Sequence, residues 1–269
     1  MKLKVALLTL GLGLLGAGAV SAAPVAVATW NFDHTLAAIE SSAPALTAID
    51  PLGQNAFVTD TVFGNSQTVY RFSGNALPVN QQAGLSVGTT GLLTQGNAYS
   101  VDMIFKFDAN QSSWEEIFGV SNRSSDNSFY VEPGNHLQIY PTGNGVDLFS
   151  FGQYHRISLT NDGSNHVTAY LDGVFQFDLL SSVMNFDSYT AANPDRLIHF
   201  FADNVMGGGQ GEYASGSVAL IRLYDGELSR TEVADLPSTP AANSVPEPTS
   251  LLLVGLALGG LSLTRRLRR

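Results

Sequence analysis

Apolar and polar residues alternate in short runs along most of residues 24–236, and helical periodicity is nearly absent there. The runs are separated by Gly, Asn, Asp and Ser, residues that favour turns. In a strand, successive side chains point to opposite faces, so a period of two marks one buried face. The clearest run, residues 99–107, places Tyr99, Val101, Met103, Phe105 and Phe107 on one face. This pattern predicts an all-β domain, either a sandwich or a barrel.

Two further runs sharpen the prediction. Asp172-Gly173 stands between strand-like residues 166–171 and 174–177. Because glycine accepts the positive φ of a tight turn, the pair predicts a β-hairpin. Residues 217–224 are apolar on both faces, which predicts a central, buried strand. Residues 37–95 are also strand-like, but the pattern there does not fix a register.

One short helix is expected near residue 230. Ser229-Arg-Thr-Glu232 fits a capping box, in which Ser229 caps the first turn and Glu232 reaches back to it. Val233 and Leu236 would then pack on the sheet. The Pro- and Ser-containing residues 237–244 follow as a solvated linker.

The composition of the chain limits which functions it can have. The 269-residue chain has no cysteine, so no disulfide supports the fold. Six of its 13 basic residues lie near the two ends, which leaves seven for the core against at most 23 acidic residues. Such an acidic surface repels nucleic acid and anionic lipid, so we expect no nucleic-acid partner.

The N-terminus has the pattern of a signal peptide. Lys2 and Lys4 precede an apolar stretch at residues 5–20, and Val20-Ser21-Ala22 supplies small residues for signal peptidase. We expect residues 1–22 to be removed by cleavage after Ala22. Cleavage after Ala23 would place Pro24 next to the cut, which is disfavoured. A lone N-terminal anchor is the alternative, although the apolar stretch is short for one.

The C-terminus has the pattern of a second targeting signal. Pro246-Glu247-Pro248 is followed by an uncharged apolar run from residue 250 and by four arginines within residues 265–269. Residues 250–264 predict a short transmembrane helix, and the arginines after it favour a cytoplasmic end. The alternative, a buried core helix, would have to accommodate the arginines at its end. In this order the three features of residues 245–269 resemble the PEP-CTERM sorting signal, which implies processing by an exosortase and a destination in the envelope or extracellular matrix.

Residues 149–236 resemble the laminin-G-like, or concanavalin A-like lectin/glucanase, superfamily. The resemblance is carried by Gly152-Gln-Tyr-His-Arg-Ile-Ser-Leu-Thr160, Ala169-Tyr-Leu-Asp-Gly-Val174 and Gly216-Ser-Val-Ala-Leu-Ile-Arg-Leu-Tyr-Asp-Gly-Glu-Leu228. Tyr154 stands near the position where the family usually has tryptophan, and Val218 where isoleucine is commoner. The resemblance implies a jelly-roll β-sandwich over residues 23–236. Another carbohydrate-binding sandwich or a fibronectin-like domain is the alternative.

The sequence shows no catalytic constellation. Neighbours in a strand point to opposite faces, so Glu115 and Glu116 cannot act as the paired carboxylates of a retaining glycosidase without a bulge. The Glu-x-Asp-x-x-Glu string of laminarinase-type members does not occur. We therefore expect both glutamates to be solvated surface residues. The five histidines lack close metal-ligand spacing, and His199 is expected to be a packed strand residue. The glycine-rich residues 207–211 lack the ending of a phosphate-binding loop.

Asp203 and Asn204 are the most informative polar pair. They follow an apolar run and open the glycine-rich stretch, which places them at a strand end. Laminin-G-like domains often hold calcium on loops at the sandwich edge, and carboxylate and amide oxygens suit that ion. Glu212 would complete such a site if the loop folds back, so calcium is the candidate cofactor. The alternative is an Asx-turn that closes the strand.

These observations favour an exported, non-catalytic β-sandwich protein that passes through the inner membrane to the cell surface or beyond. Its expected role is to bind matrix polysaccharide or another surface component. An extracellular glycan-cleaving enzyme and a structural matrix protein that contacts other proteins are the alternatives.

Overall fold

A computed structural model describes residues 25–75, 81–109, 114–205 and 212–237. The predicted signal peptide, with Ala22 and Ala23, lies outside the described residues, as do the glycine-rich stretch, most of the linker and the sorting tail with Pro246, Glu247 and Pro248. Within the described part of the chain, every helix is too short or too polar to cross a membrane.

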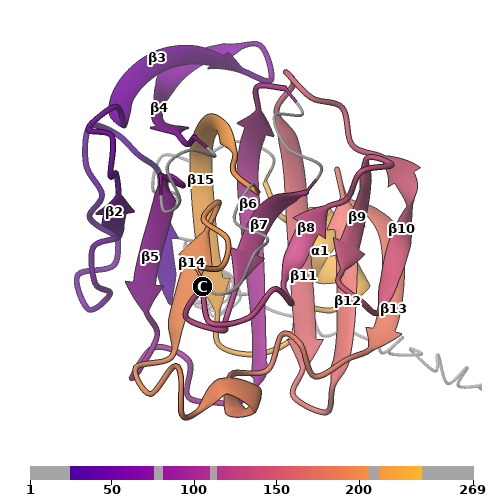
Figure 1. Cartoon of the computed structure of the whole chain (residues 1–269). Helices are drawn as coiled ribbons and strands as arrows, with labels where there is room; N and C mark the ends of the chain where they lie inside the picture. The colour runs from indigo at the N-terminus through magenta and orange to yellow at the C-terminus, as the bar shows by residue number, and fades with distance from the viewer. Residues whose placement is uncertain (1–24, 76–80, 110–113, 206–211, 238–269) are drawn as a thin grey trace, which may run out of the picture.

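The described residues form two antiparallel sheets stacked face to face (Figure 1). The eight-stranded first sheet has the order β13-β12-β11-β6-β15-β4-β3, and β1 pairs with β15 beside this path. Its strands are β1 (Ala28–Trp30), β3 (Ala56–Val62), β4 (Asn65–Ser73), β6 (Ala98–Phe107), β11 (His155–Asp162), β12 (His166–Leu171), β13 (Val174–Leu180) and β15 (Ser215–Tyr224).

The seven-stranded second sheet has the order β10-β9-β8-β7-β14-β5-β2. Its strands are β2 (Thr47–Ile49), β5 (Gly84–Gly88), β7 (Glu115–Gly119), β8 (Phe129–Val131), β9 (His136–Ile139), β10 (Gly143–Leu148) and β14 (Leu197–Phe200). The chain also forms a 3₁₀ turn, η1 (Phe186–Tyr189), and the helix α1 (Arg230–Asp235). The prediction of an all-β sandwich is therefore confirmed.

The core lies between the two sheets. The alternating apolar residues of β6, from Tyr99 to Phe107, are all buried in it, as the period of two predicts. β15 is buried along its whole length and lies between β6 and β4. The hairpin prediction is also confirmed, because Leu171 pairs with Val174 across Asp172 and Gly173. Both turn residues have positive φ, 52° and 81°, as a tight hairpin of this kind requires.

The region of unpredicted register contributes to both sheets. β3 and β4 form a long hairpin at one edge of the first sheet, with Ala56 paired to Arg71 and Val62 to Asn65. β2 and β5 pair with each other at the edge of the second sheet. Residues 47–73 thus move from the second sheet to the first, a step that no local pattern reveals.

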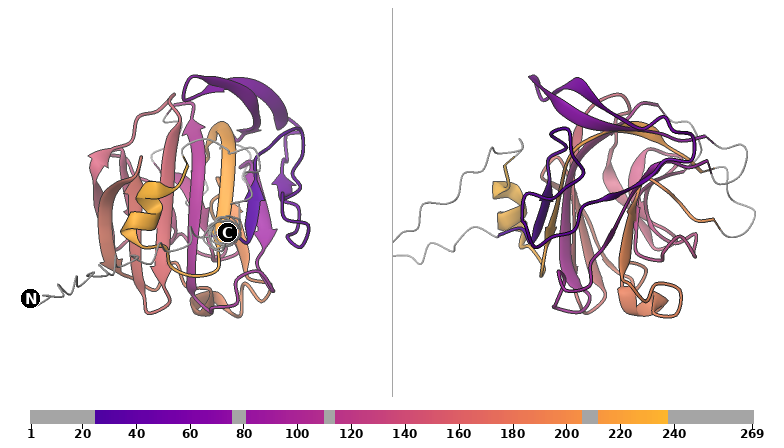
Figure 2. Two further views of the ribbon diagram at one scale, coloured as in Figure 1. Left: turned by 180° about the vertical axis from the view of Figure 1, so that it is seen from behind. Right: turned by 90° about the vertical axis from the view of Figure 1, so that its left-hand side faces the viewer.

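Helix α1 packs on the outer face of the first sheet (Figure 2). The predicted capping box is present: the Ser229 side chain accepts from the Glu232 amide, and the Glu232 side chain accepts from the Ser229 amide. Val233 and Leu236 pack against aromatic residues of β12 and β15. The position of the helix therefore follows from its cap and its two apolar residues.

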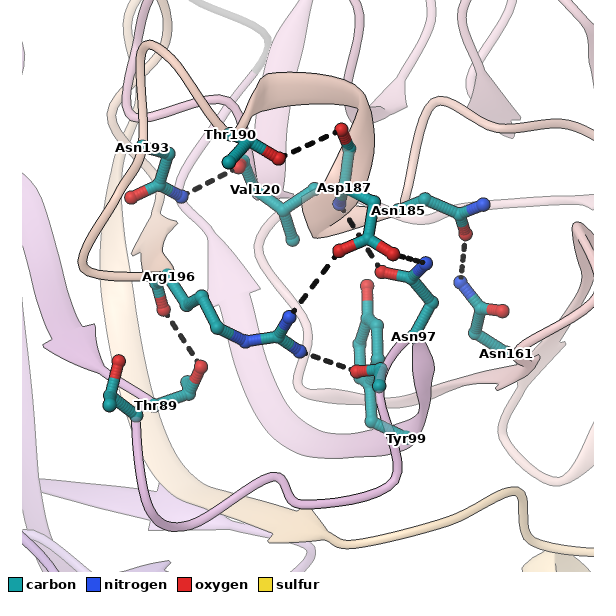
Figure 3. A network of polar contacts seen from close by, with 12 residues as sticks. Thr89, Asn97, Tyr99, Val120, Asn161, Asn185, Asp187, Thr190, Asn193 and Arg196 are labelled. Carbon is teal, nitrogen blue, oxygen red and sulfur yellow. Dashed lines mark hydrogen bonds and ion pairs between the residues drawn. The ribbon is translucent and has the colours of Figure 1, made fainter.

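Polar contacts fasten the connection from β13 to β14, which crosses from the first sheet to the second (Figure 3). Asn193 donates to the Val120 carbonyl at 2.8 Å, and the Tyr99 hydroxyl donates to the Met184 carbonyl at 2.8 Å. The Arg196 guanidinium lies 4.3 Å from the ring centre of Phe186. These contacts position the start of β14, the strand that leads to Asp203.

Candidate functional site

Three carboxylates from separate parts of the chain meet beside the second sheet. Asp126 lies in the connection between β7 and β8, Asp203 follows β14, and Glu212 precedes β15. Each offers an oxygen that lies within 4.8 Å of the other two. We call these three residues the carboxylate cluster. The structure thus brings Asp203 and Glu212 together, and adds Asp126, which the sequence analysis did not identify.

Asp203 is the innermost member, with only 2% of its surface exposed. Its Oδ1 accepts hydrogen bonds from the Tyr130 hydroxyl at 2.9 Å and from the Asn204 amide at 2.6 Å. Its Oδ2 is buried, and none of the described donors reaches it. A buried carboxylate oxygen without a donor is costly, so this atom favours a bound cation or a proton.

Asn204 supports the cluster by two contacts. Its backbone amide donates to Oδ1 of the adjacent Asp203, whereas an Asx-turn would use the amide two residues on, and its side-chain Nδ2 donates to Asp126 Oδ1 at 2.9 Å. Glu212 resembles Asp203 in one respect: its Oε2 is buried and receives no hydrogen bond from the described residues.

Glu115 and Glu116 are buried, with 1% and 4% of their surfaces exposed, so the prediction of solvated carboxylates is wrong. The reason is non-local: β7 is an inner strand of the second sheet, between β8 and β14. Glu116 lies opposite Tyr130 in the neighbouring strand, and the charge of Asp203 acts on it. It is thus a fourth carboxyl group beside the cluster.

Crowding of these acids raises their pKa values. Burial, and then the charge of Asp203, raises the pKa of Glu212 to about 8. The same two causes raise the pKa of Asp126, and they raise that of Glu116 well above its ordinary value. Arg123 is the positive charge beside them; burial lowers its pKa, whereas Glu116 and Asp203 oppose that change. The raised pKa values mean that the cluster favours bound protons, whose place a cation can take.

The donor set fits a hard divalent cation. The cluster supplies carboxylate oxygens, two of them buried without a donor from the described residues. Calcium takes six to eight oxygen ligands, so waters or ligand oxygens would complete its coordination. The carboxylate cluster is therefore a group that can hold a metal ion.

A small pocket opens beside the cluster. It has a volume of about 90 Å³ and is lined by Trp114, Tyr130, Tyr140, Asp126 and Glu212. The Trp114 ring centre lies 5.7 Å from that of Tyr130 and 5.1 Å from that of Tyr140, with both pairs close to perpendicular. The pocket thus combines aromatic walls with two carboxylates of the cluster.

Most of this site could not be found from sequence. Trp114 and Tyr140 stand in strand-like or loop-like surroundings without a recognisable motif, and Asp126 follows two serines, as many loop aspartates do. The one available signal was the pair Asp203-Asn204 at a strand end, with Glu212 shortly after it. His199 is a buried residue of β14, as expected, with 6% of its surface exposed.

Comparison with family models gives two matches. Residues 79–234 match the concanavalin A-like lectin/glucanases superfamily, and residues 244–269 match the PEP-CTERM protein-sorting motif. No curated protein matches the chain.

Solved structures share the fold at low sequence identity. Domain 4 of AbnA, a GH43 extracellular arabinanase from Geobacillus stearothermophilus solved in complex with arabinotriose, is 17% identical with a TM-score of 0.54; the match covers 80% of this chain and 98% of that chain. A structure of botulinum neurotoxin type C, described as dependent on two ganglioside molecules for cell entry, is 12% identical with a TM-score of 0.53 over 79% of this chain. The match covers 50% of the neurotoxin chain, so this chain spans about half of its length.

Proposed function

Because the chain belongs to the concanavalin A-like lectin/glucanases superfamily, we propose that it binds carbohydrate of the envelope or extracellular matrix in the pocket beside the carboxylate cluster. The sorting motif implies processing by an exosortase and an exported protein. The observation that carries the proposal is the pocket itself, where Trp114 and Tyr140 stand beside Asp126 and Glu212.

The pocket has the chemistry that a sugar requires. Aromatic rings supply large apolar contact area, and carboxylates accept hydrogen bonds from hydroxyl groups. Its volume of about 90 Å³ is well below the roughly 300–1,000 Å³ typical of pockets for drug-sized ligands. It would therefore take one unit or one end of a glycan. The arabinotriose complex of AbnA domain 4 supports the proposal that this fold presents a sugar site.

Calcium is the cofactor that we propose for the carboxylate cluster. The ion would lie against Asp203 Oδ2 and Glu212 Oε2, the two buried oxygens that no described donor reaches. Extracellular sites commonly have Kd values of about 10⁻⁴–10⁻³ M. At about 2 mM calcium, such a site would stabilise the folded state by roughly 0.6–1.8 kcal/mol. Asp203→Ala should remove this stabilisation.

Binding without cleavage is the proposed outcome, and glycan cleavage is the second candidate. The raised pKa values of Glu116 and Glu212 beside a pocket are an arrangement also found in catalytic sites. However, the cluster oxygens lie within 4.8 Å of one another, which fits joint binding of one ion. Release of reducing sugar that depends on Glu212 would favour the enzyme.

A glycan-binding screen tests the proposal, with the protein assayed in calcium and in chelator. Trp114→Ala should weaken binding at least tenfold, because it removes a pocket wall. Phe63→Ala is the matched control, since Phe63 is an exposed aromatic residue in the β3–β4 turn. Equal loss in both variants, or no binding to any matrix glycan, would contradict the proposal. Co-purification of envelope proteins without glycan binding would instead favour a structural role in the matrix.

A further inference from the structure

Gln82 links two parts of the chain that carry the cluster. It lies just before β5, with 2% of its surface exposed. Its side-chain Nε2 donates to the Glu212 carbonyl at 2.7 Å and to the Asn204 carbonyl at 3.5 Å. One amide group therefore holds together the backbone that follows β14 and the backbone that precedes β15.

Arg123 extends this link to the third part. Its Nη2 donates to Gln82 Oε1 at 2.6 Å, and its Nε donates to the Asp203 carbonyl at 2.6 Å. Its own carbonyl accepts from the Val205 amide at 3.1 Å. Arg123 stands three residues before Asp126, so the contacts tie together all three segments that supply the carboxylates.

The hydrogen bonds of the Gln82 side-chain amide are possible in only one of its two orientations. Arginine has no acceptor, so the oxygen of the Gln82 amide must face it, which turns the nitrogen toward the two carbonyls. The backbone of this segment also indicates that Arg123 is held in place, because Asn122 and Arg123 have φ values of 55° and 57°. Two consecutive non-glycine residues in the left-handed region are uncommon and need support from their surroundings.

We propose that Gln82 and Arg123 are positioning residues of the cation site, which hold the backbone of Asp203 and Glu212 at the separation that lets their carboxylates share one ion. The inference rests on the proposed calcium site. Gln82 donates to the backbone carbonyl of Glu212, and Arg123 donates to that of Asp203. Asp203 Oδ2 and Glu212 Oε2 accept no hydrogen bond from the described residues, so these two oxygens remain available to an ion. Groups that orient metal ligands in this way typically change metal affinity by 10–100-fold when they are removed.

The test measures the affinity of the full chain, purified in a non-ionic detergent, for calcium and for terbium. Terbium luminescence excited through Trp114 and Tyr130 reports binding directly and needs no glycan. Gln82→Met should weaken both affinities 10–100-fold, because methionine has similar length but offers no amide. Gln176→Met is the matched control: Gln176 is equally buried, and its side chain bonds the backbone of β10 instead of the cluster.

Two further variants keep the test decisive if Gln82→Met folds poorly. Gln82→Glu retains an acceptor for Arg123 but loses the donor to Glu212, and Arg123→Lys retains the charge but cannot make both contacts. Each should also weaken binding at least tenfold, which a purely electrostatic role of Arg123 would not produce. Wild-type affinity in these variants would overturn the positioning role and leave the cation site intact. A wild-type protein that binds neither ion would overturn both proposals.

Discussion

Glu212→Gln should make the stability of the metal-free protein less dependent on pH between pH 6.5 and 8.5. The folded-state pKa of Glu212 is raised to about 8, from an ordinary value of 4.5. A raised pKa means that the protonated form is favoured in the folded state. Its contribution to stability is therefore complete below pH 4.5 and is lost as the pH rises through 8.

The magnitude follows from the two pKa values. With 8 and 4.5, linkage gives a loss of about 2 kcal/mol between pH 6.5 and 8.5. Glu212 is partly exposed, and solvent screening reduces this to about 1–2 kcal/mol. For a domain of this size, the change corresponds to a fall in Tm of about 2–8 °C. His199, whose pKa is lowered to about 4 from 6.5, opposes this trend by only about 0.4 kcal/mol, near pH 6.5.

The assay is thermal unfolding of wild type and variant in chelator and in about 2 mM calcium. We expect the wild-type Tm to fall with pH in chelator and to change less in calcium, because the ion replaces the proton. Glu227→Gln is the control, since burial also raises the Glu227 pKa but the residue lies outside the cluster. A wild-type Tm that stays constant in chelator would refute the reasoning, as would an equal slope in Glu212→Gln.

Three further predictions concern other parts of the chain. Arg156→Met should lower the free energy of unfolding by about 3–5 kcal/mol in denaturant titrations, because Arg156 pairs with the buried Asp102. Arg71→Met, which breaks a partly exposed ion pair, is the control and should lower it by less than about 1 kcal/mol. Wild type should lose about 2–3 kcal/mol relative to His199→Gln as the pH falls from 6.5 to 4, since burial lowers the His199 pKa to about 4. Glu247→Ala should leave a protein that still ends at Arg269, as intact-mass measurement would show, whereas processed protein in this variant would contradict the sorting interpretation.

Local patterns predicted those parts of the fold that local forces determine. The period of two in residues 99–107 predicted the buried face of β6, and Asp172-Gly173 predicted a hairpin because few residues accept its dihedral angles. The capping box around Ser229 predicted α1 for a similar reason, since its hydrogen bonds form within four residues.

The carboxylate cluster depends on contacts that no local pattern encodes. Asp126 and Asp203 are 77 residues apart, and they meet because β7, β8 and β14 lie side by side in the second sheet. Burial of Glu116 has the same origin, since an isolated Glu-Glu pair in a polar setting resembles any solvated pair. Gln82 reaches Glu212 across 130 residues, so its role could only follow from the assembled fold.

The carboxylate cluster lies beside the second sheet and helix α1, near the end of the described chain, lies on the first sheet; from this we predict that processing of the tail leaves cation affinity unchanged. Tyr130, which holds Asp203, alternates with the core residues Phe129 and Val131 and so points outward from the second sheet. Helix α1 lies on the outer face of the first sheet, where Arg156 donates to its last carbonyls at 2.7 and 2.8 Å (Figure 2). None of the described contacts joins α1 to the cluster, so we expect the described support of the site to remain after loss of residues beyond 244. Equal calcium affinities in the full chain and the exosortase-processed protein would agree with this separation; a tenfold difference would show that the tail contributes to the site.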